Sequence, residues 1–341
     1  MAAGVPGIGG LTDLVEAKLT PEEGETLGRV KELLPTSATV EGWLSKVRQL
    51  VAAMSDTTKA LGVFSLDKLT TLDHSICNAI RAKVGPVTGL NLPYHRQFAS
   101  YLRNTSSRAP VELFTLNYDR LLECTLELDR IPYFDGFVGF DNAAFQDHIV
   151  SDGAESIPFD WPRIWKMHGS VGWYADEAWI VRRRIEPLAS TDEQLVFPST
   201  DTYRASRLMP YLVIQDRLRH FLATQDVILL VVGYSWGDQH INQVITSALE
   251  ANPRLHVVVA FFGDIPDPTR DLAIRPNNLT VTSPTAVIRR TVAEAWDSGV
   301  KSPLVGCRLV AMDPRGLSGV GLPTQCTRPP SPTGGHSEPR R

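Results

Sequence analysis

The sequence predicts an α/β fold with a doubly wound, mostly parallel sheet, and three observations favour this class. The apolar runs Val227–Val232 and Leu255–Phe262 are continuous rather than alternating, which is typical of strands covered on both faces. Helical patterns follow the predicted strands, as Tyr118–Leu128 follows Val111–Leu116. The early part of the chain is helical throughout, which indicates an inserted helical region.

This helical region is predicted from side chains that recur at helical spacing. The stretch from Thr39 to Met54 places one apolar face on a helix. That face comprises Val40, Trp43, Leu44, Val47, Leu50 and Val51. Leu66–Val84 and Pro93–Leu102 repeat the pattern. Because these helices supply no strand, we expect an insertion at about residues 20–106 within one domain that covers residues 1–298.

The remaining elements complete the alternation of strand and helix. A helix is predicted over Asp238–Leu249, a strand over Leu279–Thr282 and a further helix near Pro284–Trp296. The segment 299–341 is rich in Pro, Gly and Ser and has little periodicity, so we expect a disordered tail there.

The amino-acid composition and net charge bear on which classes of binding partner are expected. The 341 residues are 43% hydrophobic, enough for a large core, and the net charge is -4 with both signs mixed. A polyanion binder normally carries a basic excess, so no specific nucleic acid or membrane partner is expected. The basic run Arg182–Arg184 is interpreted as a solvated strand end or loop.

Location and metal content follow from two further features. No window approaches the ~20 apolar residues that span a bilayer, and the first residues lack the pattern of a secretory signal. Cysteines stand at Cys77, Cys124, Cys307 and Cys326, without a CxxC pair. We therefore expect a cytoplasmic protein with free thiols and no metal site.

Candidate site residues follow the strands, because ligands of parallel sheets bind at the carboxyl ends. Asn117 and Asp119 lie at the first strand-to-helix junction. One of them is enough to cap the helix, which leaves the other to face a ligand.

A histidine follows the next short apolar stretch. His168 precedes a predicted small turn at Gly169–Ser170, and a neutral imidazole is a ready general base near pH 7. The alternative is a histidine that is simply hydrogen-bonded in a turn.

A third segment, Gly233–Gly237, joins a buried strand to a helix. Glycine lets the backbone approach a phosphate or sugar closely, and a helix N-terminus favours anions. Asp238 is predicted to cap this helix, and Asn242 lies one turn later on the same face.

The same five residues also fit the G-x-S-x-G nucleophile elbow of serine hydrolases. That alternative needs an acid and then a histidine downstream of Ser235. The candidates are His240, His256 and His336, which lie in the adjacent helix, inside an apolar strand and in the tail. None is well placed, so this alternative is disfavoured.

Together, the three segments resemble the sirtuin-like family, specifically its bacterial NAD-hydrolysing branch. That branch shows Thr-x-Asn-Tyr-Asp, Lys-x-His-Gly-Ser and Gly-Tyr-Ser-Phe-x-Asp segments in this order. Here they stand as Thr115–Asp119, Lys166–Ser170 and Gly233–Asp238. Pro198–Tyr203 and Pro210–Tyr211 also look like that branch. The resemblance implies a Rossmann-like sheet of the DHS-like NAD-binding type.

The resemblance also implies chemistry: NAD is a substrate whose nicotinamide–ribose bond is cleaved, without a metal. Asn117 would position water or ribose hydroxyls, Asp119 would hold the carboxamide, and His168 would act as base. The implied nucleotide-binding residues are Gly4, Pro6, Thr115, Tyr118, Gly169, Ser170, Gly233, Tyr234, Ser235, Asp238 and Asn242. A role in antiviral (antiphage) defence and assembly into a homo-oligomer are further implications.

One departure from the family concerns the beginning of the chain. The family opens with an apolar strand and a Gly-Ala-Gly-x-Ser loop, followed by a segment that ends Gly-Ile-Pro. Here Gly4-Val5-Pro6 resembles that last piece, so we expect an N-terminal truncation. An inactive module that binds NAD or ADP-ribose is therefore an alternative. A deacylase is disfavoured, because deacylating sirtuins carry a four-cysteine zinc ribbon.

Overall fold

The computed structural model describes most of the first 295 residues. The described ranges are 6–54, 60–85, 92–104, 110–140, 142–151, 157–176, 178, 180–184, 193–196, 209–261 and 263–295. Gly4, the segment 198–203 and the predicted tail therefore lie outside the described residues.

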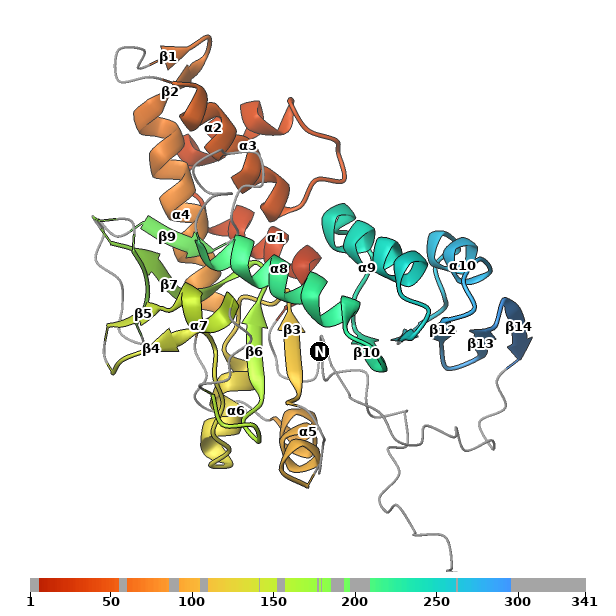
Figure 1. The fold of residues 1–341 in the computed structure, drawn as a ribbon. Helices are drawn as coiled ribbons and strands as arrows, with labels where there is room; N and C mark the ends of the chain where they lie inside the picture. Colours follow the sequence, from red (N-terminus) through yellow and green to blue (C-terminus); the bar gives the residue numbers. More distant parts are fainter. Residues whose placement is uncertain are drawn as a thin grey trace, which may run out of the picture.

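The N-terminal helices form a unit with its own core (Figure 1). They are α1 (Ile8–Lys18), α2 (Pro21–Lys31), α3 (Val40–Ala53) and α4 (Leu66–Val84), with the short hairpin β1 (Ala60–Leu61) and β2 (Phe64–Ser65). The predicted apolar face of α3 is confirmed, since Val40, Trp43, Leu44 and Val47 are buried. Thr20 and Glu23 form a capping box that fixes the start of α2.

The next helix, α5 (Pro93–Asn104), packs elsewhere. Its residues Phe98 and Leu102 share a cluster with the central strands rather than with α1–α4. The helical region predicted as one insertion therefore divides, because the apolar stripe of α5 covers the sheet.

Two groups of parallel strands confirm the α/β class. β3 (Glu112–Thr115) pairs with β6 (Arg163–Lys166) in parallel. In the second group, β10 (Val227–Val232), β11 (Leu255–Ala260) and β12 (Leu279–Thr282) are parallel neighbours in that order. Helices α6 (Leu121–Leu128), α8 (Met209–Ala223), α9 (Gln239–Ala251) and α10 (Asp267–Ala273) connect and cover these strands.

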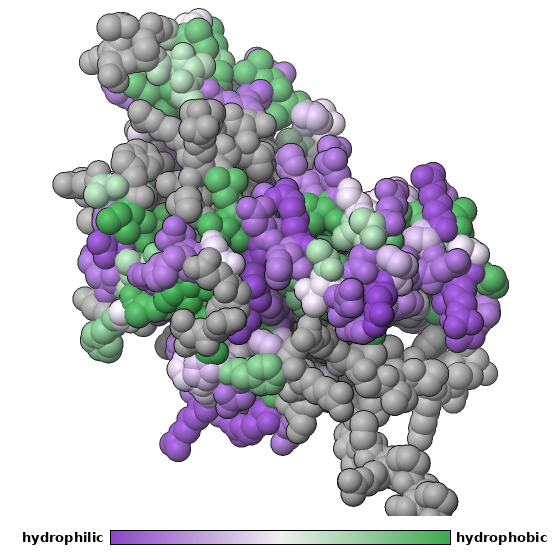
Figure 2. Space-filling view, in the orientation of Figure 1, coloured by the Kyte–Doolittle hydropathy of each residue, from purple (hydrophilic) through white to green (hydrophobic). Residues whose placement is uncertain are grey.

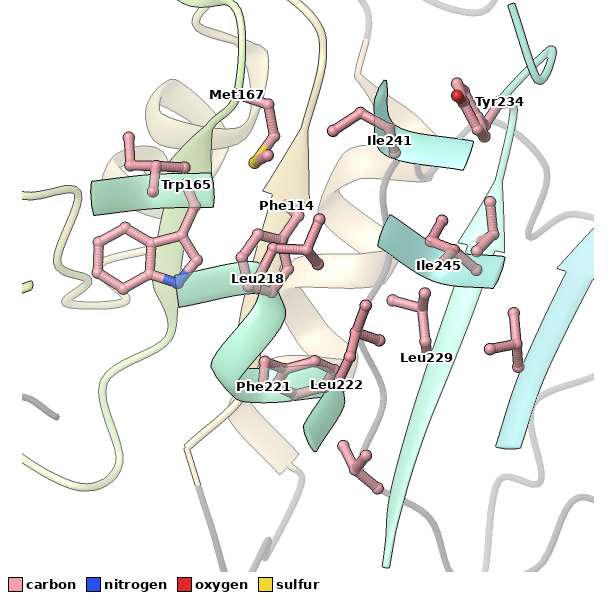
Figure 3. Close-up of a cluster of buried hydrophobic side chains, with 14 of the residues drawn as sticks. Phe114, Trp165, Met167, Leu218, Phe221, Leu222, Leu229, Tyr234, Ile241 and Ile245 are labelled. Atoms are coloured by element: carbon pink, nitrogen blue, oxygen red, sulfur yellow. The ribbon is translucent and has the colours of Figure 1, made fainter. Parts of the chain in front are cut away.

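Alternate side chains of the strands enter two different clusters. In one cluster Phe114, Trp165 and Leu229 meet residues of α8 and α9. Figure 3 shows this cluster, with Leu218, Phe221, Leu222, Ile241 and Ile245 beside the three strand residues. In the other cluster Leu113, Ile164 and Leu230 meet α5 and α6. The continuous apolar strands are thus covered on both faces, as predicted.

The outer faces of the covering helices are solvated. Figure 2 shows mainly hydrophilic residues over α8 and α9 on the side in view. Within the described ranges, no helix is long and apolar enough to cross a membrane.

The helix predicted near Pro284–Trp296 is wrong. The chain there forms a hairpin, β13 (Ala286–Arg289) and β14 (Val292–Ala295), that extends the sheet from β12. Arg290 and Thr291 adopt positive φ angles of 47° and 67°, as a two-residue hairpin turn requires. Burial of Val287 and Ile288 beside β12 outweighs the helix propensity of the Ala- and Glu-containing segment.

A second, antiparallel sheet also departs from the prediction of a mostly parallel fold. Its order is β4-β5-β8-β7-β9. The bounds are β4 (Phe137–Val138), β5 (Ala143–Phe145), β7 (Gly169–Ala175), β8 (Val181–Arg183) and β9 (Glu193–Val196), with α7 (Asp147–Ser151) after β5. Gly169 and Ser170, predicted as a turn, begin strand β7, and the turn lies at Met167–His168 instead.

The basic run ends a strand, as predicted, but it is half-buried and paired rather than solvated. Arg182 donates from Nε to Asp176 Oδ2 at 2.7 Å, and Arg183 pairs with the buried Asp135. The guanidinium of Arg184 lies 5.0 Å from the ring centre of Tyr174. Each of the three arginines thus has a partner within the fold, and a bound polyanion is not needed to explain the basic run.

A buried ion cluster joins α8 to the start of β3. We predict that it contributes more to the free energy of unfolding than an exposed ion pair does. Arg217 Nε donates to Glu112 Oε2 at 2.9 Å, and both side chains are below 10% exposure. Arg217→Met leaves a buried carboxylate short of a partner, so unfolding free energy should fall by about 3 kcal/mol in urea denaturation.

The matched control lies two residues away. Arg219 pairs with Asp216 on the same helix, with side chains 55% and 74% exposed. Arg219→Met should therefore cost less than about 1 kcal/mol. Equal losses of unfolding free energy in Arg217→Met and Arg219→Met would contradict the larger contribution of the buried cluster.

Candidate functional site

Three chain segments that follow β3, β6 and β10 meet at one end of the strands. The amide of Met167 donates to the Thr115 carbonyl at 2.9 Å, and Val171 donates to the Tyr118 carbonyl at 3.1 Å. His168 Nε2 lies 2.8 Å from Asp238 Oδ2. Strands β3, β6 and β10 are distant in sequence, but the loops that follow them come together.

The loop after β3 carries two polar side chains of the predicted site, Asn117 and Asp119. Asp119 Oδ1 accepts a hydrogen bond from the Leu121 amide at 3.1 Å, which caps the start of α6. Asn117 is half-buried, and its side-chain amide has no hydrogen-bond partner in the described part of the chain. One oxygen of Asp119 therefore supplies the predicted cap, and which side chains of the loop face a ligand stays a prediction.

His168 is held by an acidic partner from the loop after β10. The two side chains are 16% and 22% exposed, so the contact is largely shielded from water. With Nε2–H donating to Asp238, the Nδ1 lone pair of a neutral imidazole is the basic one. A hydrogen bond from Nε2–H to the aspartate thus fixes a tautomer and an orientation for the imidazole.

Asp238 also caps α9, as predicted. Its Oδ1 accepts from the amides of His240 at 2.8 Å and Ile241 at 3.1 Å. Burial acts to raise the pKa of this carboxyl. The hydrogen bonds from His168 and the two amides outweigh burial and hold the pKa below its ordinary value of 3.8. The carboxylate is therefore charged at neutral pH.

Hydrogen bonds within the loop after β10 and the first turn of α9 hold this loop in place. The Tyr234 hydroxyl lies 3.0 Å from the Asp238 carbonyl and 2.6 Å from Asn242 Oδ1. The amide nitrogen of Asn242 donates to the Trp236 carbonyl at 2.8 Å. Both ends of the Asn242 amide thus shape the loop. Gly233 and Ser235 are exposed, and the positive φ of Gly233, 70°, suits glycine.

Several predicted nucleotide-binding side chains are engaged inside the protein. Tyr118 is buried in the core of the helical unit, and its hydroxyl donates to Glu41 of α3. Thr115 Oγ1 accepts from the Asn117 amide at 3.1 Å, and Ser170 Oγ donates to the Tyr118 carbonyl at 3.3 Å. In this geometry they shape the loop, as does Gly169 with a φ of 83°. Pro6 is half-buried just before α1, and its binding role remains a prediction.

Sequence reasoning did not single out Lys166 as a site residue. Lys166 ends β6 and is only 3% exposed, with Nζ 3.2 Å from the Asn117 carbonyl and 3.2 Å from Glu123 Oε1. It also donates to the Asp119 carbonyl. A lysine directly after the apolar pair Ile164–Trp165 was the available signal, because a buried ammonium needs partners.

The serine-hydrolase alternative gains no support from this geometry. Within the described ranges, no hydrogen bond joins Ser235 to a histidine, and His256 Nε2 lies 3.0 Å from Thr280 Oγ1 in the sheet. His168 faces Asp238 instead. The same ranges contain no group of three or more His, Cys, Asp or Glu side chains that could hold a metal ion.

The fold and the loop residues define an α/β protein with a site at the carboxyl ends of its parallel strands. A family profile described as "SIR2-like domain" matches residues 111–281, just over half of the chain. The chain belongs to the SIR2-like family. A search of curated proteins gave no match. SIR2-like domains use NAD, and the matched range contains all three loop segments.

Proposed function

We propose that this protein hydrolyses NAD to nicotinamide and ADP-ribose at the site formed by Asn117, Asp119 and His168. The observation that carries the proposal is the contact between His168 and Asp238, in a turn whose first residue, Met167, donates to the carbonyl of Thr115 just before the Asn117 loop. An oriented base and an amide without a partner suit the activation and placement of a water molecule. The SIR2-like domain supports NAD as the nucleotide.

The reaction can be written with these residues in their roles. The bond between the ribose anomeric carbon and the pyridinium nitrogen breaks, and its electron pair leaves with nicotinamide as a neutral molecule. Water adds to the anomeric carbon, and Nδ1 of His168 accepts the proton that the water loses. Asn117 positions the water or the ribose hydroxyls, and Asp119 holds the carboxamide. The positive charge that develops on the ribose is stabilised by these polar groups.

The packing supports a further part of the proposal, that a strand outside the described residues lies between β3 and β10. β3 and β10 supply side chains to the same two clusters, yet among the described strands β3 pairs only with β6 and β10 only with β11. Unpaired backbone groups of buried strands are costly. We propose that a strand outside the described residues pairs with both, which completes a doubly wound sheet. The Gly-Ala-Gly-x-Ser loop implied by the resemblance would follow that strand.

The experiment compares nicotinamide release by the present chain and by a form extended upstream. We expect release from the extended form, and little or none from the present chain, because the glycine loop would cradle the pyrophosphate. Equal rates from both forms would contradict the role of an upstream strand. The absence of release from both would contradict the hydrolase.

The second candidate is a module that binds NAD or ADP-ribose without turnover. Among the described strands, β3 and β10 each have one edge without a partner, which favours this candidate, since a binding site can survive when catalytic alignment is lost. Calorimetric titration with NAD and ADP-ribose distinguishes it: binding without nicotinamide release from the extended form supports the module. The proposed biological role is that of an antiviral effector in the cytoplasm, supported only by the resemblance of the motifs.

A further inference from the structure

We infer that Lys166 is a positioning residue, which fixes the Asn117–Asp119 loop through the loop's backbone carbonyls. This inference rests on the proposed function for its kinetic consequence. Lys166 is the last residue of β6, and it is paired with Thr115, the last residue of β3. The side chain therefore starts beside the point where the loop leaves the sheet.

The ammonium group has three hydrogens and three acceptors around it. Two acceptors are the carbonyls of Asn117 and Asp119, and the third is Glu123 Oε1 at 3.2 Å. The lysine ammonium has three N–H donors and no acceptor, so each donor has one acceptor here. Because the carbonyls belong to the two residues proposed to face the substrate, the position of Lys166 sets the position of both side chains.

Burial makes this arrangement stiff. The side chains of Lys166 and Glu123 are 3% and 11% exposed, so water cannot easily replace a lost contact. Hydrogen bonds to charged groups are stronger than neutral ones, and a buried charge without partners is unfavourable. Glu123 projects from α6, whose start is capped by Asp119. The loop is thus tied both to β6 and to the helix that follows it.

The test must separate positioning from stability. Lys166→Met alone strands the Glu123 carboxylate and is expected to destabilise the protein strongly. The informative variant is Lys166→Met/Glu123→Leu, which removes both buried charges together. Its control is Glu123→Gln, which removes the countercharge of Lys166 and so lowers the unfolding free energy, but keeps the bonds of Lys166 to the two loop carbonyls.

The first measurement is amide hydrogen exchange in the full chain, which requires no catalysis. In Lys166→Met/Glu123→Leu, exchange of the hydrogen-bonded loop amides of Asn117 and Leu121 should accelerate at least about tenfold, as expected when a hydrogen bond to a charged group is lost. Exchange in β10 and β11 should stay unchanged. Glu123→Gln should retain the protection of the loop. An unchanged loop in the double variant would overturn the inference.

The second measurement is steady-state nicotinamide release. The double variant should lose about 10²-fold in kcat, as a small misplacement of aligned groups does, with a much smaller change in KM. Glu123→Gln should stay close to the wild type. A double variant with unchanged kcat would overturn the inference. If the wild type itself releases no nicotinamide, the proposed function fails, and hydrogen exchange alone decides whether Lys166 positions the loop.

Discussion

His168→Ala is expected to reduce nicotinamide release from NAD by about 10²–10⁴-fold, the usual contribution of a general base. The reason is the geometry of the imidazole, which lies 2.8 Å from Asp238 and presents its other nitrogen as the basic one. Affinity for NAD should change little, because the base acts on the water rather than on bound nucleotide. The measurement is kcat and KM for nicotinamide release by the extended protein.

His240→Ala is the matched control. His240 lies two residues after Asp238 and is exposed, and it contributes its backbone amide rather than its ring to the Asp238 carboxylate. Its substitution should leave kcat within about twofold of the wild type, as expected of a side chain with no role in proton transfer. Equal losses in His168→Ala and His240→Ala would show that the loop, rather than the base, was damaged.

Asp238→Asn is expected to give the second large loss. An asparagine oxygen can still accept the two amides that cap α9, so the helix start should survive. Toward His168, however, the carboxylate acceptor is replaced by an amide donor. The imidazole must then accept at Nε2 and carry its hydrogen at Nδ1, which removes the basic lone pair. We expect kcat to fall by about 10²–10⁴-fold, approaching the loss of the histidine itself.

A stability measurement separates this effect from unfolding. The pKa of Asp238 is lower in the folded protein than its ordinary value of 3.8. Its contribution to stability is therefore fully present above about pH 4 and is lost as the pH falls through the folded pKa. The difference in urea stability between wild type and Asp238→Asn should shrink as the pH falls from 6 to 3. A kcat of Asp238→Asn equal to that of the wild type would contradict the tautomer argument.

Much of the parallel part of the fold was predictable, because its signals are local. The run Val227–Val232 forms β10 over the predicted range, and Leu279–Thr282 likewise forms β12. The cap of α6 was also predictable, since Asp or Asn at a strand-to-helix junction commonly accepts from the first helical amides.

Other features depended on contacts that a single segment does not reveal. The hairpin after β12 arises because Val287 and Ile288 are buried at a sheet edge, which local propensity did not show. The engagement of Tyr118 depends on Glu41, far away in the sequence. The partner of His168 was not identifiable either, because Asp238 looked sufficient as a helix cap and is in fact both cap and partner.

The most direct test of the central claim is a single-turnover experiment with the upstream-extended protein in molar excess over NAD. Excess protein lets even slow turnover go to completion, and the products are quantified by chromatography. The account predicts that all NAD is converted to nicotinamide and ADP-ribose in equal amounts, and that His168→Ala leaves NAD intact over the same period. NAD that is recovered unchanged from the wild type, although titration shows that it binds, would contradict the account.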